Sequence, residues 1–283
     1  MNLKKSLLYN SKFYYGAKTI YIDVTDIMKI NILSTNIVVI NNKLFKCDPY
    51  PNVIKYLKIK NYNNIGKHIL IKENDSIKLE YDKIKPTYNI NTISQDLNNY
   101  NAVNIFGKGP TFTNMKKEHN YVLHIGINQA VNLLDEVDML VINDIHNIFK
   151  ITVNTFKKLK YILTPEYMNV DLHYNINGYW ENAYIFAINN GFTGVYIIYN
   201  LKNRKINNNI ITLESYVTSS NTAIEFICRY TNIIDIQTYG VANGLNYGKE
   251  FDGNGIYDEE RIKFIHDNII FLKKKYKKNI IIN

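Results

Sequence analysis

The amino-acid sequence predicts an α/β protein in which a Rossmann-like, mainly parallel sheet flanked by helices follows a small antiparallel β domain. Up to about residue 83, short runs of alternating β-branched and aromatic residues are separated by turn residues, which is typical of antiparallel strands. After Tyr100, near-continuous Val and Ile runs alternate with stretches of helical period. That pattern indicates strands buried on both faces, and hence a parallel sheet.

The first region is expected to consist of strands without helices, because Asn-rich and Pro-containing turns divide its apolar runs. The predicted strands are Phe13–Gly16, Thr19–Val24, Asn36–Ile40, Val53–Ile59 and His68–Lys72. The segment Ile84–Tyr100 has little apolar periodicity and is predicted to be a linker. We therefore expect a small β-rich domain over residues 1–90 and a nucleotide-binding domain over residues 91–283. The first domain could be a lectin-like or partner-binding module, or a structural cap.

In the second region, strand-length apolar runs are joined by helix-length segments. The predicted strands are Ala102–Phe106, Tyr121–Ile125, Asp138–Ile142, Tyr161–Thr164, Tyr184–Ile188, Gly194–Tyr199, Ile233–Tyr239 and Asn279–Ile282. The predicted helices are Ile127–Leu134, Ile145–Leu159, Ser219–Thr231 and Asp258–Tyr276. The third of these helices has a small apolar face behind a Thr-Ser-Ser start that can cap its own first turn.

Composition limits the partners and the cellular compartment that we expect for the protein. The net charge is +9, but the lysines are scattered, and the densest run, Lys273–Lys278, suits the negative end of the last predicted helix. No nucleic-acid partner is therefore expected. Cys47 and Cys228 are the only cysteines, which favours a reducing compartment. No apolar run is long enough for a membrane span or signal peptide, so we expect a cytoplasmic protein. Abundant Asn, Ile, Lys and Tyr suggest an AT-rich genome.

The first predicted strand of the parallel sheet runs directly into Gly107-Lys108-Gly109-Pro110-Thr111. In open α/β sheets, ligands bind beyond the carboxyl ends of the strands, where glycines let the backbone approach a phosphate or ribose and free amides can point at it. The spacing matches neither the dinucleotide fingerprint nor the Walker loop. An ordinary tight turn is the alternative interpretation.

Polar residues also follow the next two predicted strands and open a later helix. Asn128 follows the second strand, and Asn143 and Asp144 follow the third. Because parallel strands end at one edge, these side chains can meet a nucleoside there, although each could instead be a helix N-cap. Thr218, Ser219 and Ser220 offer hydroxyls and helix N-terminal amides as a second anion site, or a simple cap.

Taken together, these segments resemble a known family. The series Ile105–Thr111, Gly126–Ala130, Thr218–Ser220 before a helix, and Ile236–Val241 is similar to the sialyltransferase-type fold. That fold includes bacterial sialyltransferases that use CMP-sialic acid and related pterin-pyrophosphokinase-like proteins. The resemblance covers roughly residues 101–282 and leaves the N-terminal β domain unexplained.

The resemblance implies ligand roles for particular residues. Gly107, Gly109, Pro110, Thr111 and Asn128 would hold the CMP moiety, and the Thr218–Ser220 turn would hold the donor's phosphate and carboxylate. Two departures are notable. Ala242 stands where the family commonly has Asp, and Ser220 replaces a usual glycine. Either change implies altered donor choice or lost activity.

Sialyl transfer needs a general base for the acceptor hydroxyl, and the family uses a histidine near the last helix. His266 is the only histidine in that region, but it falls inside the predicted helix rather than before it. Asp258 or Glu260 could take its place as a carboxylate base. No Asp-x-Asp motif or His/Cys cluster indicates a metal site.

The sequence therefore predicts a metal-independent glycosyltransferase that needs no cofactor and transfers a sugar from a CMP-activated donor to a glycan or other hydroxyl acceptor. Its expected partners are the nucleotide sugar and the acceptor, and a homo-oligomer remains open. One alternative is a catalytically inactive nucleotide- or glycan-binding scaffold. Another is a pterin-type diphosphokinase, which would require Mg²⁺ and ATP.

Overall fold

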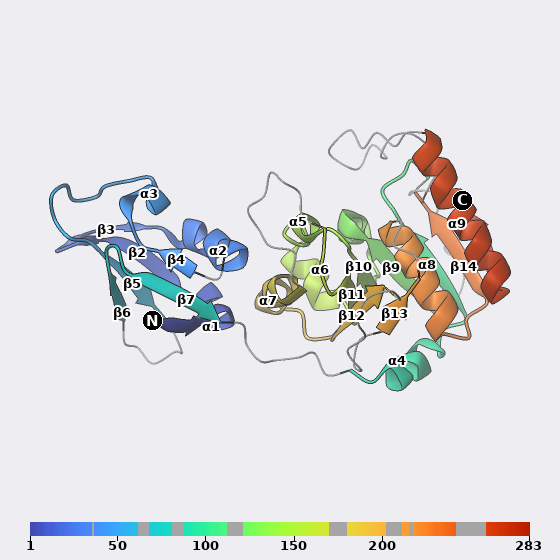
Figure 1. Ribbon diagram of the computed structural model, residues 1–283. Coiled ribbons are helices and arrows are strands. Elements are labelled where there is room, and N and C mark those ends of the chain that lie inside the picture. Colours follow the sequence, from blue (N-terminus) through green and yellow to red (C-terminus); the bar gives the residue numbers. More distant parts are fainter. Residues whose placement is uncertain are drawn as a thin grey trace. The chain divides into compact units, whose positions relative to one another are not determined.

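The computed structural model divides the chain into two compact units (Figure 1). The first unit comprises Met1–Lys85 and Val170–Asn189, and the second comprises Pro86–Asn169 and Asn190–Asn283. The structure describes residues 1–35, 37–61, 68–80, 88–111, 121–169, 180–201, 211–214, 218–241 and 259–283. Each unit has its own core of buried apolar residues.

The first unit contains two small sheets. Its strands are β1 (Asn2–Lys4), β2 (Lys12–Ala17), β3 (Ile20–Asp23), β4 (Ile37–Val39), β5 (Tyr56–Lys60), β6 (Ile69–Lys72) and β7 (Ser76–Glu80). One sheet is antiparallel with the order β3-β2-β5-β6. In the other, of order β1-β7-β4, β1 is parallel and β4 antiparallel to β7. The predicted antiparallel strands are confirmed, but β1 and β7 were not expected.

The expectation that the first region needs no helix is wrong. The first unit contains α1 (Lys5–Tyr9), α2 (Thr25–Ser34), α3 (Asn42–Phe45) and α7 (Trp180–Asn189). Helix α2 turns Met28 and Ile32 into the core with exposed fractions of 0%, and this spacing of four residues is helical. Just before the helix, the Asp23 carboxylate accepts a hydrogen bond from the Thr25 amide (2.9 Å). The buried Lys5 of α1 donates to Asn182 of α7 (3.5 Å).

The second unit is built on an eight-stranded sheet with the order β13-β12-β11-β10-β9-β8-β14-β15, in which every pair is parallel. Its strands are β8 (Ala102–Phe106), β9 (Val122–Ile127), β10 (Met139–Val141), β11 (Tyr161–Pro165), β12 (Val195–Leu201), β13 (Ile211–Leu213), β14 (Asp235–Tyr239) and β15 (Asn279–Ile282). Strands β8 to β12 have mostly buried residues on both faces. The predicted fold class, a parallel α/β sheet flanked by helices, is confirmed.

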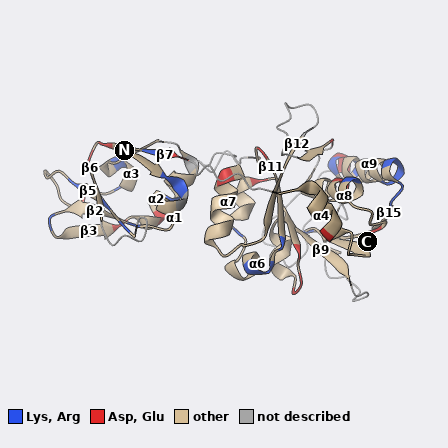
Figure 2. Ribbon diagram, turned by 90° about the horizontal axis from the view of Figure 1, so that it is seen from below, with Lys and Arg blue, Asp and Glu red and all other residues tan. Residues whose placement is uncertain are grey.

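Helices connect and cover the strands of this sheet. They are α4 (Ile90–Leu97), the 3₁₀ helix η3 (Asn128–Leu133), α5 (Ile145–Ile148), α6 (Val153–Lys158), α8 (Ser219–Tyr230) and α9 (Glu259–Tyr276). Helices α8 and α9 pack against each other (orange to red in Figure 1). The lysines in the last turn of α9 lie at its C-terminal end (blue in Figure 2), where the helix dipole favours cations.

Several sequence-based assignments in this region are wrong. The predicted linker contains α4, because Ile93 and Leu97 lie four residues apart and both enter the core. Residues Tyr184–Ile188, predicted as a strand, belong to α7, which buries Ala183 and Ala187 on one face. The single helix expected over Ile145–Leu159 is two helices, since Thr152 caps a new start at α6. Strand β13 was missed.

The strand order reverses beside β8. From β8 the chain proceeds strand by strand to β13 on one side, and then returns to place β14 on the other side of β8. The turns after β8 and β14 therefore meet at the carboxyl edge. The Gly107 amide donates to the Tyr239 carbonyl and the Gly109 amide to the Gly240 carbonyl, both at 2.7 Å.

Only glycine fits this contact between the two turns. A Cβ atom on Gly109 would lie 2.7 Å from the Gly240 carbonyl oxygen, and one on Gly240 would lie 2.8 Å from the Gly109 amide nitrogen. Gly240 also has φ +63°, a conformation that costs an L-residue roughly 1–2 kcal/mol. The glycines of the motif thus have a structural reason to be there, independent of any ligand.

We expect Gly240→Ala to lower the free energy of unfolding by about 3 kcal/mol or more, through backbone strain and overlap with the turn after β8. Gly191→Ala is the matched control, because Gly191 also has positive φ but faces only the flexible Lys157 side chain. It should cost about 1–2 kcal/mol. Urea unfolding followed by circular dichroism measures both, and equal losses would contradict the backbone contact.

Candidate functional site

The residues chosen from the sequence gather at the carboxyl edge of the eight-stranded sheet. The glycine turn follows β8, Asn128 follows β9, and Asn143 and Asp144 follow β10. In open parallel sheets, ligands bind at this edge, beside the point where the strand order reverses. Here that point lies between β8 and β14. The topology therefore places the glycine turn where such a site is expected.

The glycine turn does not present its amides as the sequence led us to expect. The amide of Gly107 donates to a carbonyl at the end of β14, and that of Gly109 donates to the Gly240 carbonyl. Neither amide is therefore available to a phosphate. The Thr111 hydroxyl accepts from the Gly240 amide (2.8 Å) and donates to the Asn283 carbonyl (2.6 Å). Pro110 is exposed. The turn thus ties β8, β14 and Asn283 together, and the polar groups that remain at this edge are mainly neighbouring side chains.

Lys108 is such a side chain, and the sequence had not singled it out. Its ammonium donates to Gln129 Oε1 (3.4 Å), and Gln129 donates to Asn147 Oδ1 (3.5 Å). Burial lowers the pKa of Lys108, as does the nearby Lys150, while Asp144 acts in the opposite direction. A half-buried ammonium at this edge is suited to an anionic ligand, which would compensate its lost hydration.

Asp144 accepts at the far end of the same network. Its two carboxylate oxygens receive hydrogen bonds from Asn147 (3.4 Å) and Asn169 (3.0 Å). Asp144 occupies the N-cap position of α5, but its side chain makes no capping hydrogen bond. The network therefore runs from the turn after β8 to the residue after β10, along the carboxyl edge.

Asn128 has the most unusual environment in the site. It adopts φ +51° directly after β9, a conformation that asparagine tolerates better than most residues. Among the residues that the structure describes, its buried Oδ1 atom has no hydrogen-bond partner, and an unsatisfied buried acceptor costs roughly 1–3 kcal/mol. An acceptor without a partner at the carboxyl edge can accept a hydrogen bond from a group that approaches this edge from outside the protein.

Asn143 has a different role in the protein. It is only 3% exposed, it donates to the Thr222 hydroxyl (3.2 Å), and it accepts from the Tyr199 hydroxyl (3.0 Å). Both polar atoms of its amide are thus engaged within the protein. Asn143 links the end of β10 to the first turn of α8, and so positions that helix rather than presenting an open ligand contact.

The start of α8 is an N-cap, as the alternative interpretation of the sequence held. Thr218 accepts a hydrogen bond from the Asn221 amide (3.2 Å). Ser219 is buried, whereas Ser220 is partly exposed. The first amides of a helix have no partner within it, so Ser219 and Ser220 can still offer backbone donors to an anion.

The candidate bases lie on or before α9. Asn221 in the first turn of α8 donates to the Ile265 carbonyl (3.4 Å) and to Asn268 Oδ1 (2.9 Å). These contacts bring the segment that contains His266 alongside the helix start that carries Thr218. Glu260 is exposed in the first turn of α9. Asp258 and Ala242 lie outside the described residues.

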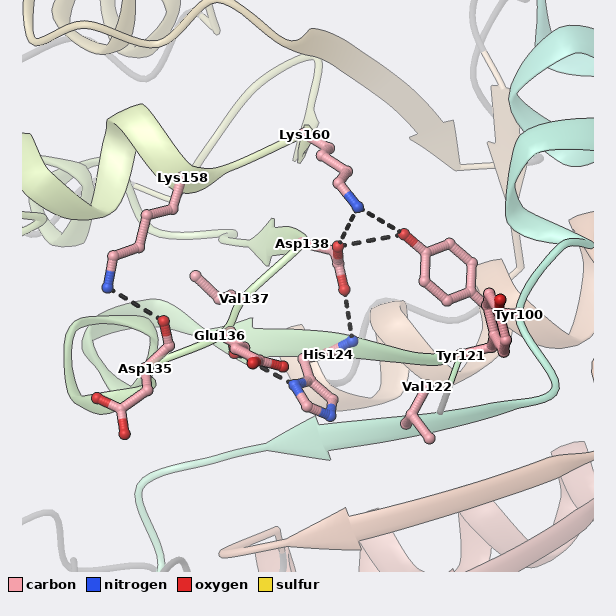
Figure 3. Close-up of a pocket in the computed structure, with 10 residues that line it drawn as sticks. All are labelled: Tyr100, Tyr121, Val122, His124, Asp135, Glu136, Val137, Asp138, Lys158 and Lys160. Carbon is pink, nitrogen blue, oxygen red and sulfur yellow. Dashed lines mark hydrogen bonds and ion pairs between the residues drawn. The ribbon is translucent and has the colours of Figure 1, made fainter. Parts of the chain in front are cut away.

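A hollow of about 720 Å³ lies at the opposite, amino edge of the sheet (Figure 3). It is lined by Tyr100, Tyr121, Val122, His124, Asp135, Glu136, Val137, Asp138, Lys158 and Lys160. None of these residues was chosen from the sequence. They come from the segments that precede the four strands β8, β9, β10 and β11, and from the first residues of β9. No sequence motif links these segments.

The polar side chains at the centre of this hollow bind one another (Figure 3). Lys160 pairs with Asp138 (2.7 Å) and donates to the Tyr100 hydroxyl (2.9 Å), which itself donates to Asp138 (3.1 Å). The hydrogen bond to Asp138 raises the pKa of Lys160, and burial raises that of Tyr100. These groups are hydrogen-bonded to one another, which is typical of a contact that stabilises the fold by joining the starts of neighbouring strands.

Compared with known proteins, the chain matches no family model, no curated protein and no solved structure. Among the described residues, no three His, Cys, Asp or Glu side chains gather as a metal site requires. In that same part of the chain, no helix combines the length and apolar character of a membrane span.

We expect Lys108→Met to raise the melting temperature of the ligand-free protein at neutral pH and to weaken binding of a nucleoside monophosphate. The lowered pKa means that the protonated amine is disfavoured in the folded state relative to the unfolded chain. Removing it relieves that cost and also removes the cation. Lys150→Met, on an exposed neighbour, should change both quantities much less. A lower melting temperature for Lys108→Met would contradict this account.

Proposed function

We propose that the protein is a metal-independent glycosyltransferase of the sialyltransferase type, which transfers a sugar from a CMP-activated donor to a glycan or other hydroxyl acceptor in the cytoplasm. One observation carries the proposal. The strand order reverses between β8 and β14, directly beside the glycine turn and one strand from the orphaned acceptor of Asn128. This is the position at which α/β proteins bind nucleotides.

Each part of the donor has a chemically suitable neighbour at this edge. The Asn128 Oδ1 atom can accept from a cytosine amino group or a ribose hydroxyl. The Lys108 ammonium can pair with the phosphate, and the first amides of α8 can donate to the phosphate or to the sugar carboxylate. Because the amides of Gly107 and Gly109 are already engaged, this assignment differs from the one that the resemblance implied.

The reaction requires little covalent chemistry from the protein. A base removes the proton of the acceptor hydroxyl, the oxygen attacks the anomeric carbon, and the bond from that carbon to the phosphate oxygen breaks as CMP leaves with the electron pair. Holding both substrates together and stabilising the leaving phosphate account for most of the acceleration. His266 is our candidate base, since its segment of α9 contacts the start of α8.

A nucleotide-binding protein without transferase activity is the second candidate function. The observation that favours it is the engagement of the glycine-turn amides with β14 and Gly240, which leaves fewer groups to stabilise a leaving phosphate. Such a protein would bind the nucleotide with the same side chains and release no product. A diphosphokinase would instead respond to ATP and Mg²⁺.

Thermal shift with CMP, CDP, UDP, GDP and ATP tests the ligand. We expect stabilisation by CMP and CDP only, because the proposed site recognises cytosine. A ligand at a hundred times its Kd adds about 2.7 kcal/mol to the free energy of unfolding, which such a measurement detects. Asn128→Gly keeps the positive φ and removes the orphaned oxygen. It should abolish the CMP-induced shift while changing the stability of the free protein by less than about 1 kcal/mol. Indifference of the wild-type protein to all five nucleotides would refute the proposal.

Turnover of CMP-sialic acid with lactose as acceptor tests the base. His266→Ala should lower kcat by about a hundredfold or more and leave the CMP-induced thermal shift intact, since a base is not needed to bind CMP. Asp267→Ala, at the neighbouring position on α9, is the control and should keep its activity. Unchanged turnover in His266→Ala would assign the role to Glu260 or Asp258, which Glu260→Gln and Asp258→Asn distinguish.

A further inference from the structure

The outward face of the four-stranded sheet in the first unit has an unusual composition. Phe13, Tyr15, Leu57, Ile59 and Ile71 point inward and are buried in the core. The alternating residues, at least partly exposed except for Gly16, form the opposite face, as the pleat requires. We call this opposite face the lysine–tyrosine face. It consists of Lys12, Tyr14, Gly16, Tyr21, Asp23, Tyr56, Lys58, Lys60, Leu70 and Lys72.

Strand register interleaves the lysines and tyrosines on this face. Tyr21 and Tyr56 pair with Gly16 from either side, so two aromatic side chains flank a position without a side chain. In the next row Tyr14 pairs with Lys58. Lys72 extends the first row beside Tyr56, and Lys12 pairs with Lys60 in a third row. The register thus collects three tyrosines and four lysines from four strands.

This face carries four lysines and one carboxylate, that of Asp23, which interacts electrostatically with Lys12, so it keeps a net positive charge. Within the described part of the protein, none of the four lysines has a carboxylate at ion-pair distance. The ammonium groups of Lys60 and Lys58 instead lie 4.7 Å from the Tyr14 ring centre and 5.8 Å from that of Tyr21. The single acidic residue, Asp23, accepts a hydrogen bond from the Thr25 amide at the start of α2 (2.9 Å). The face is therefore cationic and aromatic together.

We propose that the lysine–tyrosine face binds single-stranded nucleic acid. Exposed tyrosines provide surfaces on which unpaired bases stack, and interleaved lysines follow the phosphates. An exposed lysine–tyrosine contact is worth about 0.5–1 kcal/mol, whereas a base stacked on an aromatic ring is worth about 1–3 kcal/mol. A base can therefore displace the ammonium from the ring, and the released lysine then meets the adjacent phosphate.

The composition favours this ligand over other anionic surfaces. A glycan site needs amides or carboxylates to fix the sugar hydroxyls, and this face offers only Asp23, which is engaged at α2. A membrane-binding face needs bulky apolar residues, and Leu70 is the only aliphatic residue here. The expectation that no nucleic acid binds followed from the scattered lysines in the sequence. Strand pairing brings four of them together, independently of the transferase proposal.

Fluorescence anisotropy with a labelled oligothymidine or oligouridine of about 15 nucleotides tests the proposal. The Kd should rise with salt with a log–log slope of at most about 3, as expected for four lysines. Lys58→Glu combined with Lys60→Glu should weaken binding by more than about tenfold. The control, Lys43→Glu combined with Lys78→Glu, changes net charge equally at exposed positions outside this face and should have an effect below about twofold.

Stacking is tested separately from charge. Tyr21→Leu and Tyr56→Leu should each weaken binding roughly 5- to 100-fold, whereas Tyr121→Leu, at an exposed tyrosine of the second unit, should have no effect. Circular dichroism confirms folding, and Lys58→Gln with Lys60→Gln replaces any charge reversal that does not fold. Equal affinity for a duplex of the same length, equal loss in the control variants, or binding to phosphatidylserine vesicles without binding to the oligonucleotide would overturn the proposal.

Discussion

The carboxyl edge of the sheet in the second unit depends on a backbone contact between the turns after β8 and β14. Gly107, Gly109 and Gly240 lack side chains, so these turns approach closely enough for two amide–carbonyl hydrogen bonds. This contact joins the two turns at the place where the strand order reverses, beside which open parallel sheets bind their ligands. The glycine amides are therefore used within the protein, and the polar groups left at the carboxyl edge are mainly side chains.

That constraint changes how the glycine motif should be understood. A glycine turn after a strand is commonly taken as a phosphate cradle, yet here its amides hold the sheet together. The groups left for a ligand are the ammonium of Lys108, whose pKa burial lowers, the orphaned oxygen of Asn128 and the start of α8. Buried charge and unsatisfied acceptors destabilise the free protein. Such costs are typical of binding sites.

The sequence predicted the strands that a local residue pattern determines. It missed the features that depend on contacts between residues distant in sequence. The bounds of β8 and β15 agree with the structure, because short runs rich in Val and Ile between polar residues favour strands. Tyr184–Ile188 was taken for a strand, since its aromatic and β-branched residues favour one, although the spacing of Ala183 and Ala187 is helical. The role of Lys108 and the lysine–tyrosine face depend on neighbours distant in sequence. No single-sequence pattern reveals such neighbours.

Hydrogen–deuterium exchange with and without CMP tests the central claim most directly, because it reports where the ligand binds without assuming any residue's role. The geometry predicts slower exchange in peptides that cover Phe106–Thr111, Asn128–Leu133 and Thr218–Thr222, with little change around Tyr100, Asp138 and Lys160 at the amino edge. Protection confined to the amino edge, or none at the carboxyl edge at saturating CMP, would contradict the account.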